Sequence, residues 1–183
     1  MNIKKGSWTV VGSKVVYKNP WIKVREDKVI RPDGKNGIFG IVTMKKGVTI
    51  LPYDDNGKVY LTKEYQYSVE RVSIEAISGG IDDKESILDA AKRELKEEAG
   101  LVAEDWVDFS FVDPFTSVVV SPNYLYLVRG LSRVKQNQEG TETIKIIKVP
   151  FSKALDWAMN GKITHSATVV LILKAAIYLK ENK

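Results

Sequence analysis

The chain of 183 residues contains no cysteine and a single histidine, His165. The lack of cysteine excludes disulfide bonds and thiolate metal sites. Because a zinc site needs a cluster of histidine or cysteine ligands, zinc is excluded as well. Any metal held by this chain must therefore be bound by aspartate and glutamate oxygens. His165 falls at the start of a predicted helix, where we interpret it as a surface or capping residue and not as a catalytic base.

The sequence also lacks an apolar run long enough to cross a membrane. The longest apolar stretch, 167–179, is interrupted by Lys174 and is shorter than the roughly 20 residues that a spanning helix needs. The first residues, MNIKKGSWTVVG, have no apolar segment of the kind that signal peptides carry. We therefore expect a cytoplasmic protein that has no membrane partner.

The net charge is +5, from 28 basic and 23 acidic residues. An excess of positive charge can favour nucleic acid as a partner. In this chain the lysines are scattered, and adjacent lysine pairs occur only at 4–5 and 45–46. We therefore expect the positive field to attract small anionic substrates, and we expect no nucleic-acid partner.

No repeat, low-complexity tract or linker divides the chain. Turn residues separate strand patterns and helical patterns along the whole sequence. Strands are predicted at 8–17, 22–30, 38–44, 48–52, 59–67, 107–112, 124–129 and 143–149, and helices at 85–99, 152–160 and from a cap at 164 or 166 to 180. Strands in runs, with no alternation of strand and helix, predict an α+β sandwich. The long segment 113–123 is either a loop that shapes a binding mouth or a plain connector.

The most informative segment is 79–101, GGIDDKESILDAAKRELKEEAGL. Residues 85–99 contain no proline or glycine, which predicts a helix that Gly100 ends. Glu94, Glu97 and Glu98 fall within one arc of about 100° at the edge of the apolar face, and no basic residue lies inside that arc. Repulsion between these carboxylates indicates a compensating cation, and all-oxygen ligation suits Mg²⁺ or Mn²⁺. A solvated acidic face is the alternative.

The same segment resembles the Nudix signature at every defined position: Gly79-x5-Glu85-x7-Arg93-Glu94-Leu95-x-Glu97-Glu98-x-Gly100-Leu101. Residues 75–85, EAISGGIDDKE, are similar to the approach segment of the ADP-ribose and nucleotide-sugar pyrophosphatase branch, although Ile77 and Ser78 replace its usual Pro and Ala. The resemblance implies the Nudix fold, a mixed β-sheet between helices (α/β/α). It also implies a hydrolase domain at 46–183, preceded by an antiparallel β-segment at 1–45 that is not an independent domain.

The resemblance implies roles for the residues of the signature. Glu94, Glu97 and Glu98, with a backbone carbonyl near Ser78, would hold the metal, which polarises phosphoryl oxygens and activates a water molecule. Glu97 would thereby belong to the catalytic residues. Gly79 and Gly80 let the backbone approach phosphate or metal closely. Arg93 would fix Glu85 through a bidentate ion pair, with direct phosphate binding as the alternative.

A second carboxylate source is the polar segment 136–143, QNQEGTET. In the resembling branch the corresponding loop supplies a carboxylate that helps to orient the attacking water or to bind metal. Either Glu139 or Glu142 could have this role, and an ordinary solvated turn is the alternative.

Base recognition is implied for the N-terminal segment. Trp21 lies where the branch places an aromatic residue that stacks on the nucleobase, often across a dimer interface, and Tyr17 and Phe39 are its neighbours in the same strand system. A buried core position is the alternative for Trp21. Gln66 replaces an arginine of the branch, which leaves nucleoside diphosphate sugars other than ADP-ribose open. Apolar strands at 8–22 exceed what the catalytic sandwich needs, which predicts a homodimer.

Together these features predict a Mg²⁺-dependent hydrolase. Its expected substrate is a nucleoside diphosphate sugar, such as ADP-ribose or GDP-mannose, which it would cleave to a nucleoside monophosphate and a sugar phosphate. One alternative keeps the chemistry but takes nucleoside triphosphates or dinucleotides as substrates. A second alternative is an inactive nucleotide-sensing domain, but none of the glutamates of the signature has been lost.

Overall fold

The computed structural model describes residues 2–135 and 144–182. It divides into two compact units, of which the first contains the chain up to Lys45 together with Asp113–Pro122. The second unit contains Lys46–Val112 and the chain from Asn123 onward. The segment at 113–122, which the expected hydrolase domain at 46–183 would include, therefore belongs to the N-terminal unit.

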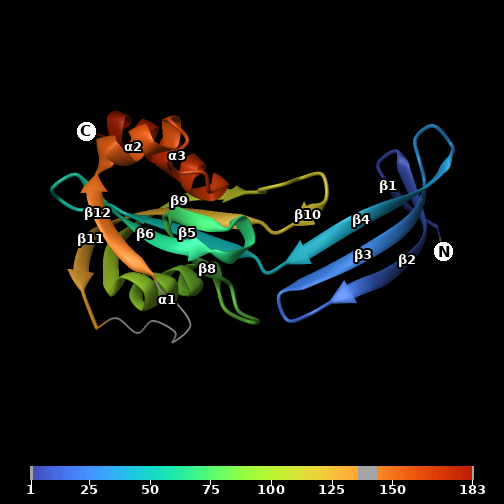
Figure 1. The fold of residues 1–183 in the computed structure, drawn as a ribbon, viewed down its shortest axis with the longest axis horizontal. Coiled ribbons are helices and arrows are strands. Elements are labelled where there is room, and N and C mark those ends of the chain that lie inside the picture. The colour runs from blue at the N-terminus through green and yellow to red at the C-terminus, as the bar shows by residue number, and fades with distance from the viewer. Residues whose placement is uncertain (1, 136–143, 183) are drawn as a thin grey trace. The chain divides into compact units, whose positions relative to one another are not determined.

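The first unit is a five-stranded sheet with the order β1-β2-β3-β4-β10 (Figure 1). Its strands are β1 (Ile3–Lys5), β2 (Trp8–Lys18), β3 (Ile22–Ile30), β4 (Asn36–Met44) and β10 (Val119–Val120). β1 to β4 pair in antiparallel fashion, and β10 runs parallel to β4. The expected antiparallel N-terminal segment is present, and the distant segment that carries β10 extends it.

Trp21 lies in the turn between β2 and β3 and is 70% exposed. The turn is held by Asn19, whose Oδ1 accepts hydrogen bonds from the backbone N–H groups of Trp21 and Ile22 at 2.9 and 2.7 Å. A core side chain would be buried, so the core interpretation of Trp21 is wrong. Tyr17, at the same end of the sheet, is also more than half exposed.

Phe39 is not a neighbour of this turn. Its ring packs edge-to-face against Trp8, with the ring centroids 5.5 Å apart. In the register of the sheet, Ile22 pairs with Met44. Phe39 lies five positions further along β4, which corresponds to about 16 Å at the usual rise per strand residue. The structure therefore brings Tyr17 and Trp21 to one end of the sheet and leaves Phe39 away from them.

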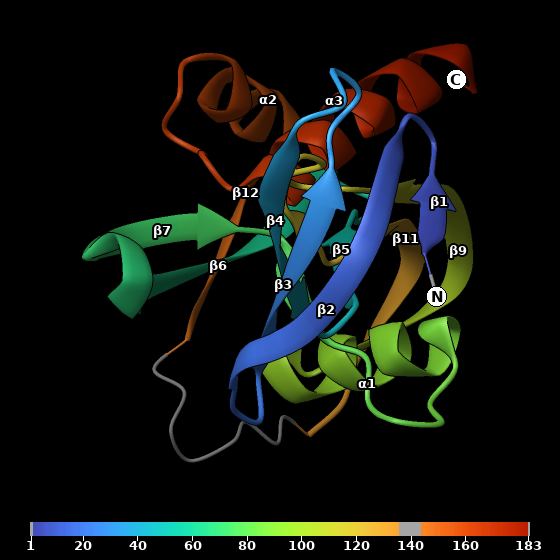
Figure 2. The same ribbon diagram turned by 90° about the vertical axis from the view of Figure 1, so that its right-hand side faces the viewer.

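The strands of the second unit form two sheets and not one. The four-stranded sheet has the order β8-β5-β11-β9, and the three-stranded sheet has the order β12-β6-β7. Their bounds are β5 (Gly47–Pro52), β6 (Lys58–Gln66), β7 (Arg71–Glu75), β8 (Ile77–Gly80), β9 (Leu101–Val112), β11 (Asn123–Arg133) and β12 (Lys145–Pro150). β5 and β11 are parallel, and the other neighbours are antiparallel, so the arrangement is mixed. The 3-10 helix η1 (Tyr67–Val69) closes the hairpin of β6 and β7 (Figure 2).

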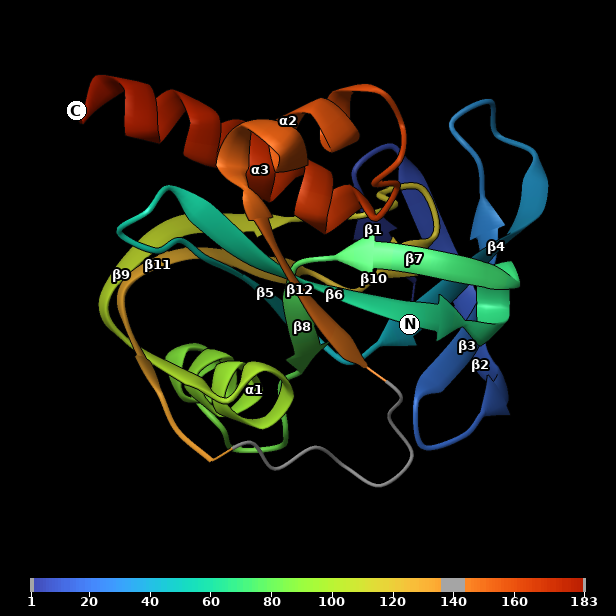
Figure 3. The same ribbon diagram turned by 60° about the vertical axis from the view of Figure 1, so that its left-hand side comes forward.

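Helices cover both faces of these strands (Figure 3). α1 (Ile87–Ala99) lies on one side, and α2 (Phe151–Met159) and α3 (Ser166–Glu181) lie on the other. Alternate residues of β11 divide between the two cores: Leu125 and Leu127 pack with α3, whereas Tyr126 and Val128 pack with α1. This α/β/α arrangement is the sandwich that the sequence predicted. Among the described residues, no helix combines the length and the apolar character needed to cross a membrane.

The chain changes sheets at Ala76, the single residue between β7 and β8. Ala76 is fully buried, and its N–H donates a hydrogen bond of 2.9 Å to Thr168 Oγ1 on α3. The hydroxyl of Thr62 donates to the carbonyl oxygen of Glu75 at 3.2 Å. Two side chains thus supply hydrogen bonds to the backbone at the corner that precedes β8.

We expect Thr168→Val to lower the free energy of unfolding by about 1–3 kcal/mol, because a buried N–H group loses its acceptor while the shape of the side chain is kept. Urea denaturation followed by circular dichroism measures this change. Thr168→Ser, which keeps the hydroxyl, is the matched control and should lose less stability. If the serine variant were the less stable of the two, packing of the methyl group and not the hydrogen bond would hold the corner.

Candidate active site

Two of the three glutamates that the sequence singled out are buried between α1 and β8. Ser86 begins the helix, and its Oγ accepts a hydrogen bond from the N–H of Asp89. Further along α1, Glu94 and Glu98 are 9% and 6% exposed. Glu98 Oε2 accepts a hydrogen bond from the backbone N–H of Ser78 at 3.4 Å. α1 therefore presents two carboxylates to the backbone of β8.

Gly79 explains how the helix and the strand approach so closely. A Cβ atom at this position would overlap the carboxylate carbon and both carboxylate oxygens of Glu94. Only glycine leaves room for the Glu94 side chain beside the strand. The sequence predicts that Gly79 lets the backbone approach phosphate or metal, and the structure adds this contact with Glu94.

Arg93 connects the carboxylates to the segment that precedes the helix. Its Nε and Nη2 donate to the two oxygens of Glu85 at 2.9 and 3.0 Å, and Nη2 also donates to the carbonyl oxygen of Gly80 at 2.9 Å. Nη1 donates to Glu94 Oε1 at 2.7 Å and to Glu97 Oε2 at 3.1 Å. Glu85 contributes most to a raised pKa of the Arg93 guanidinium, and Glu94 and Glu97 raise that pKa further.

The contact between Arg93 and Glu85 that the resemblance implied is present. The statement that no basic group lies among the three glutamates of α1 is wrong for the folded side chains. The Cα of Arg93 is outside their arc, but its long side chain turns back and reaches Glu94 and Glu97. A helical-wheel argument places Cα atoms, and it does not follow a side chain with four rotatable bonds.

The oxygen ligands at this site fit a hard divalent cation, although their side chains are not arranged around a single metal position. Within residues 2–135 and 144–182, no group of three acidic or histidine side chains has the geometry to hold a metal ion. The available ligands are oxygens only, with buried carboxylates at 94 and 98 and the partly exposed Glu97 beside the backbone of β8. Such a set matches Mg²⁺ or Mn²⁺. Ligation by Ser78, Glu94, Glu97 and Glu98 stays a prediction.

The other predicted residues belong to different parts of the chain. Gln66 ends β6 and donates from Nε2 to Glu64 Oε2 at 3.4 Å. Trp21 belongs to the first unit, and Gln66 to the second. Glu139 and Glu142 lie outside the described residues.

Two family models match the chain. Residues 43–166 match the NUDIX domain, and residues 8–42 match the nucleoside diphosphate sugar hydrolase N-terminal domain. The chain belongs to the Nudix family. The sequence interpretation as a Nudix enzyme of the pyrophosphatase branch is thereby confirmed.

This Nudix protein is also similar to individual proteins along most of its length. It is 24% identical to a methanol dehydrogenase activator of Bacillus methanolicus, over 88% of this chain and 89% of that protein. It is 23% identical to an ADP-ribose pyrophosphatase of Bacillus subtilis, with the same coverage of both chains. The crystal structure of an ADP compounds hydrolase superposes with a TM-score of 0.86, at 21% identity over 96% of this chain and 95% of that one. The Nudix fold is therefore confirmed.

Proposed function

We propose that this Nudix protein is a Mg²⁺-dependent pyrophosphatase that hydrolyses nucleoside diphosphate sugars, with ADP-ribose as the first candidate. The products would be a nucleoside monophosphate and a sugar phosphate. The observation that carries the proposal is the joint presence of the buried Glu94 and Glu98 beside β8 and of an N-terminal segment that matches nucleoside diphosphate sugar hydrolases. The similarity to an ADP-ribose pyrophosphatase of Bacillus subtilis supports the choice of substrate.

In this proposal each residue of the site has a separate task. Glu94 and Glu98, with Glu97 and the Ser78 carbonyl, hold the metal. A bound divalent ion polarises phosphoryl oxygens and lowers the pKa of a water molecule. The glycines at 79 and 80 leave the backbone of β8 accessible to the diphosphate. Arg93 positions the segment before α1 through Glu85 and the carbonyl oxygen of Gly80.

The direct test is hydrolysis of a substrate panel with Mg²⁺, and with Mn²⁺ in a parallel series. The panel contains ADP-ribose, GDP-mannose, a nucleoside triphosphate and a dinucleoside polyphosphate, and products are identified by ³¹P NMR. Release of a nucleoside monophosphate from ADP-ribose or GDP-mannose supports the proposal. Preferential cleavage of the triphosphate or the dinucleotide would show that nucleoside diphosphate sugars are not the preferred substrates. Binding of nucleotides without any cleavage would leave the sensing domain as the better description.

We further propose that the protein acts in the cytoplasm as a homodimer in which Trp21 stacks on the nucleobase. The exposure of Trp21 and Tyr17, together with that of Val11, Val15 and Val16 on β2, supports an apolar face that a second copy could cover. Stacking of an aromatic side chain such as Trp21 on a nucleobase stabilises binding by about 1–3 kcal/mol.

We expect Trp21→Ala to raise KM about tenfold or more and to leave kcat nearly unchanged, because base binding is the same in the ground state and the transition state. Steady-state kinetics measure both constants, and light scattering measures the oligomeric state. Ile38→Ala, a loss of another exposed apolar side chain in the same sheet, is the matched control and should leave KM unchanged. A monomer whose KM does not respond to Trp21→Ala would exclude this proposal.

The water-orienting glutamate is proposed to come from the segment at 136–143, with Glu139 as the first candidate and Glu142 as the second. Glu139→Gln should lower kcat by about 100-fold with little change in KM, since a group that acts in the transition state contributes little to substrate binding. The Glu142→Gln variant, measured in the same assay, tells the two positions apart. If both variants retain the parent kcat, neither glutamate acts in catalysis.

A further inference from the structure

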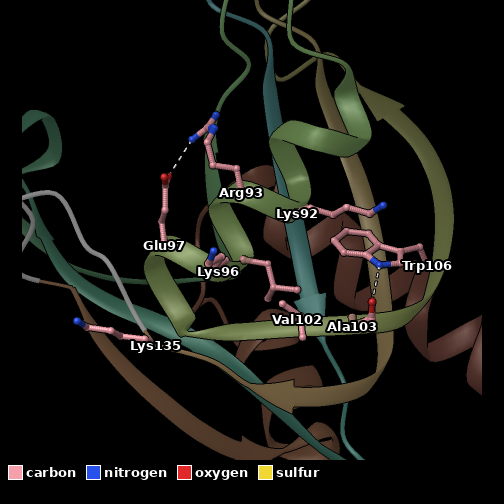
Figure 4. A pocket seen from close by; sticks show the side chains of 9 residues that line it. Lys92, Arg93, Lys96, Glu97, Val102, Ala103, Trp106 and Lys135 are labelled. Carbon is pink, nitrogen blue, oxygen red and sulfur yellow. Dashed lines mark hydrogen bonds and ion pairs between the residues drawn. The ribbon is translucent and has the colours of Figure 1, made fainter.

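A groove of about 650 Å³ runs along the outer side of α1, between this helix and the first residues of β9 (Figure 4). All of its lining residues belong to the second unit. They are Lys92, Arg93, Leu95, Lys96, Glu97, Val102, Ala103, Trp106 and Lys135. Sites for small molecules occupy roughly 300–1,000 Å³, so the groove has room for one such ligand.

The rim of the groove has more positive charge than the described residues around it neutralise. Lys92 and Lys96 lie one helical turn apart on α1, and Lys135 follows β11. Among the residues that the structure describes, none of these three lysines forms an ion pair. Among the described lining residues, the only acidic one is Glu97, and it is paired with Arg93. Like charges four residues apart destabilise a helix by a few tenths of a kcal/mol, and a bound anion would remove this cost.

The opposite wall of the groove is apolar and contains a fixed aromatic ring. Trp106 is partly exposed, and its indole N–H donates to the carbonyl oxygen of Ala103 at 3.1 Å. Its ring also packs edge-to-face against Tyr126, with the centroids 5.7 Å apart. These two contacts set the orientation of the ring. A partly exposed indole that two contacts orient is a suitable surface on which a planar base can stack.

We propose that this groove binds a nucleoside monophosphate, with its base on Trp106 and its phosphate at Lys92 and Lys96. This binding site differs from the proposed site of hydrolysis, because Glu94 and Glu98 are buried on the face of α1 that meets β8 and do not line the groove. Arg93 and Glu97 contact both regions. The assignment depends on the groove alone and does not require that the protein hydrolyse any nucleotide.

The test is a titration of the full chain with AMP, followed through the indole N–H signals of the ¹⁵N-labelled protein. The chain has four tryptophans, and Trp106→Phe identifies the signal of Trp106. EDTA is present throughout, so that no divalent ion can recruit AMP to the glutamates of the proposed hydrolytic site. The Trp106 signal should shift in a saturable manner. Adenosine and inorganic phosphate, titrated separately, should each bind at least about tenfold more weakly than AMP, because each offers only one of the two contacts.

The double variant Lys92→Gln/Lys96→Gln should weaken AMP binding about tenfold or more, since two charges next to the phosphate are lost. The matched control Lys63→Gln/Lys180→Gln removes the same charge from two exposed positions of the second unit and should bind as the parent does. A Trp106 signal that does not move with AMP would exclude the site. An equal loss of affinity in both double variants would also exclude it, because a general charge effect would then explain the binding. Neither result depends on whether ADP-ribose is hydrolysed.

Discussion

Replacing Glu98 by glutamine should lower kcat by about 100-fold or more, because a carboxylate proposed to neutralise transition-state charge is lost. The fold should be retained. Glutamine keeps the shape of the buried side chain and an oxygen that can accept the hydrogen bond from the N–H of Ser78. Activity should also disappear in EDTA and return with Mg²⁺ or Mn²⁺.

The measurement is steady-state hydrolysis of ADP-ribose, with thermal unfolding recorded on the same preparations. Glu104→Gln changes an exposed glutamate on β9 and serves as the matched control. Full activity of the Glu98→Gln protein would remove Glu98 from the proposed metal ligands. Activity that persists in EDTA would remove the metal from the mechanism.

Gly79→Ala should reduce activity by about 100-fold or more while the protein still folds. The added methyl group overlaps the carboxylate of Glu94, and this side chain must move away from β8. The overlap involves the end of a side chain and not the backbone, so we expect an overpacking cost of only about 1–3 kcal/mol in the free energy of unfolding. The displaced carboxylate, by contrast, can no longer lie beside the proposed Ser78 ligand.

Gly40→Ala is a suitable comparison, because this glycine is also in a strand and a Cβ there meets no heavy atom within 4 Å. Its kcat and stability should remain close to those of the parent protein. An active and stable Gly79→Ala protein would show that Glu94 does not need its place beside the strand. In that case Glu94 would not be a metal ligand in the arrangement proposed here.

Helix α1 could be predicted from the sequence because the residues that favour the helix and end it are neighbours in the chain. Helix-forming residues without proline or glycine are followed directly by Gly100, and the structure begins the helix only two residues later than predicted, at Ile87. β8 was missed for the opposite reason. Its sequence, ISGG, resembles a turn, and it is a strand only because it pairs with β5, where Ser78 lies opposite Thr49.

The same distinction applies to the candidate site. The spacing of the glutamates predicted that Glu94, Glu97 and Glu98 share one arc at the edge of the apolar face, since helical periodicity fixes their direction. In the structure two of them, Glu94 and Glu98, are buried beside β8. The contact of Gly79 with Glu94 depends on the distance between a strand and a helix, which no local pattern encodes. The groove beside Trp106 was missed because it combines Lys92 and Lys96 on a helix with residues of a separate strand. Their partners across the groove, Val102 and Ala103, come from a part of β9 that the sequence analysis did not assign to a strand.

The position of Arg93 has a consequence for the newly synthesised protein. Many small metalloproteins fold only when the metal arrives, because the free energy of metal binding drives their folding. In this chain the guanidinium of Arg93 already neutralises part of the charge of Glu85, Glu94 and Glu97. The helix can therefore be completed in the absence of a divalent ion. In the proposed mechanism, a shortage of metal would then lower the turnover of each molecule without preventing it from folding.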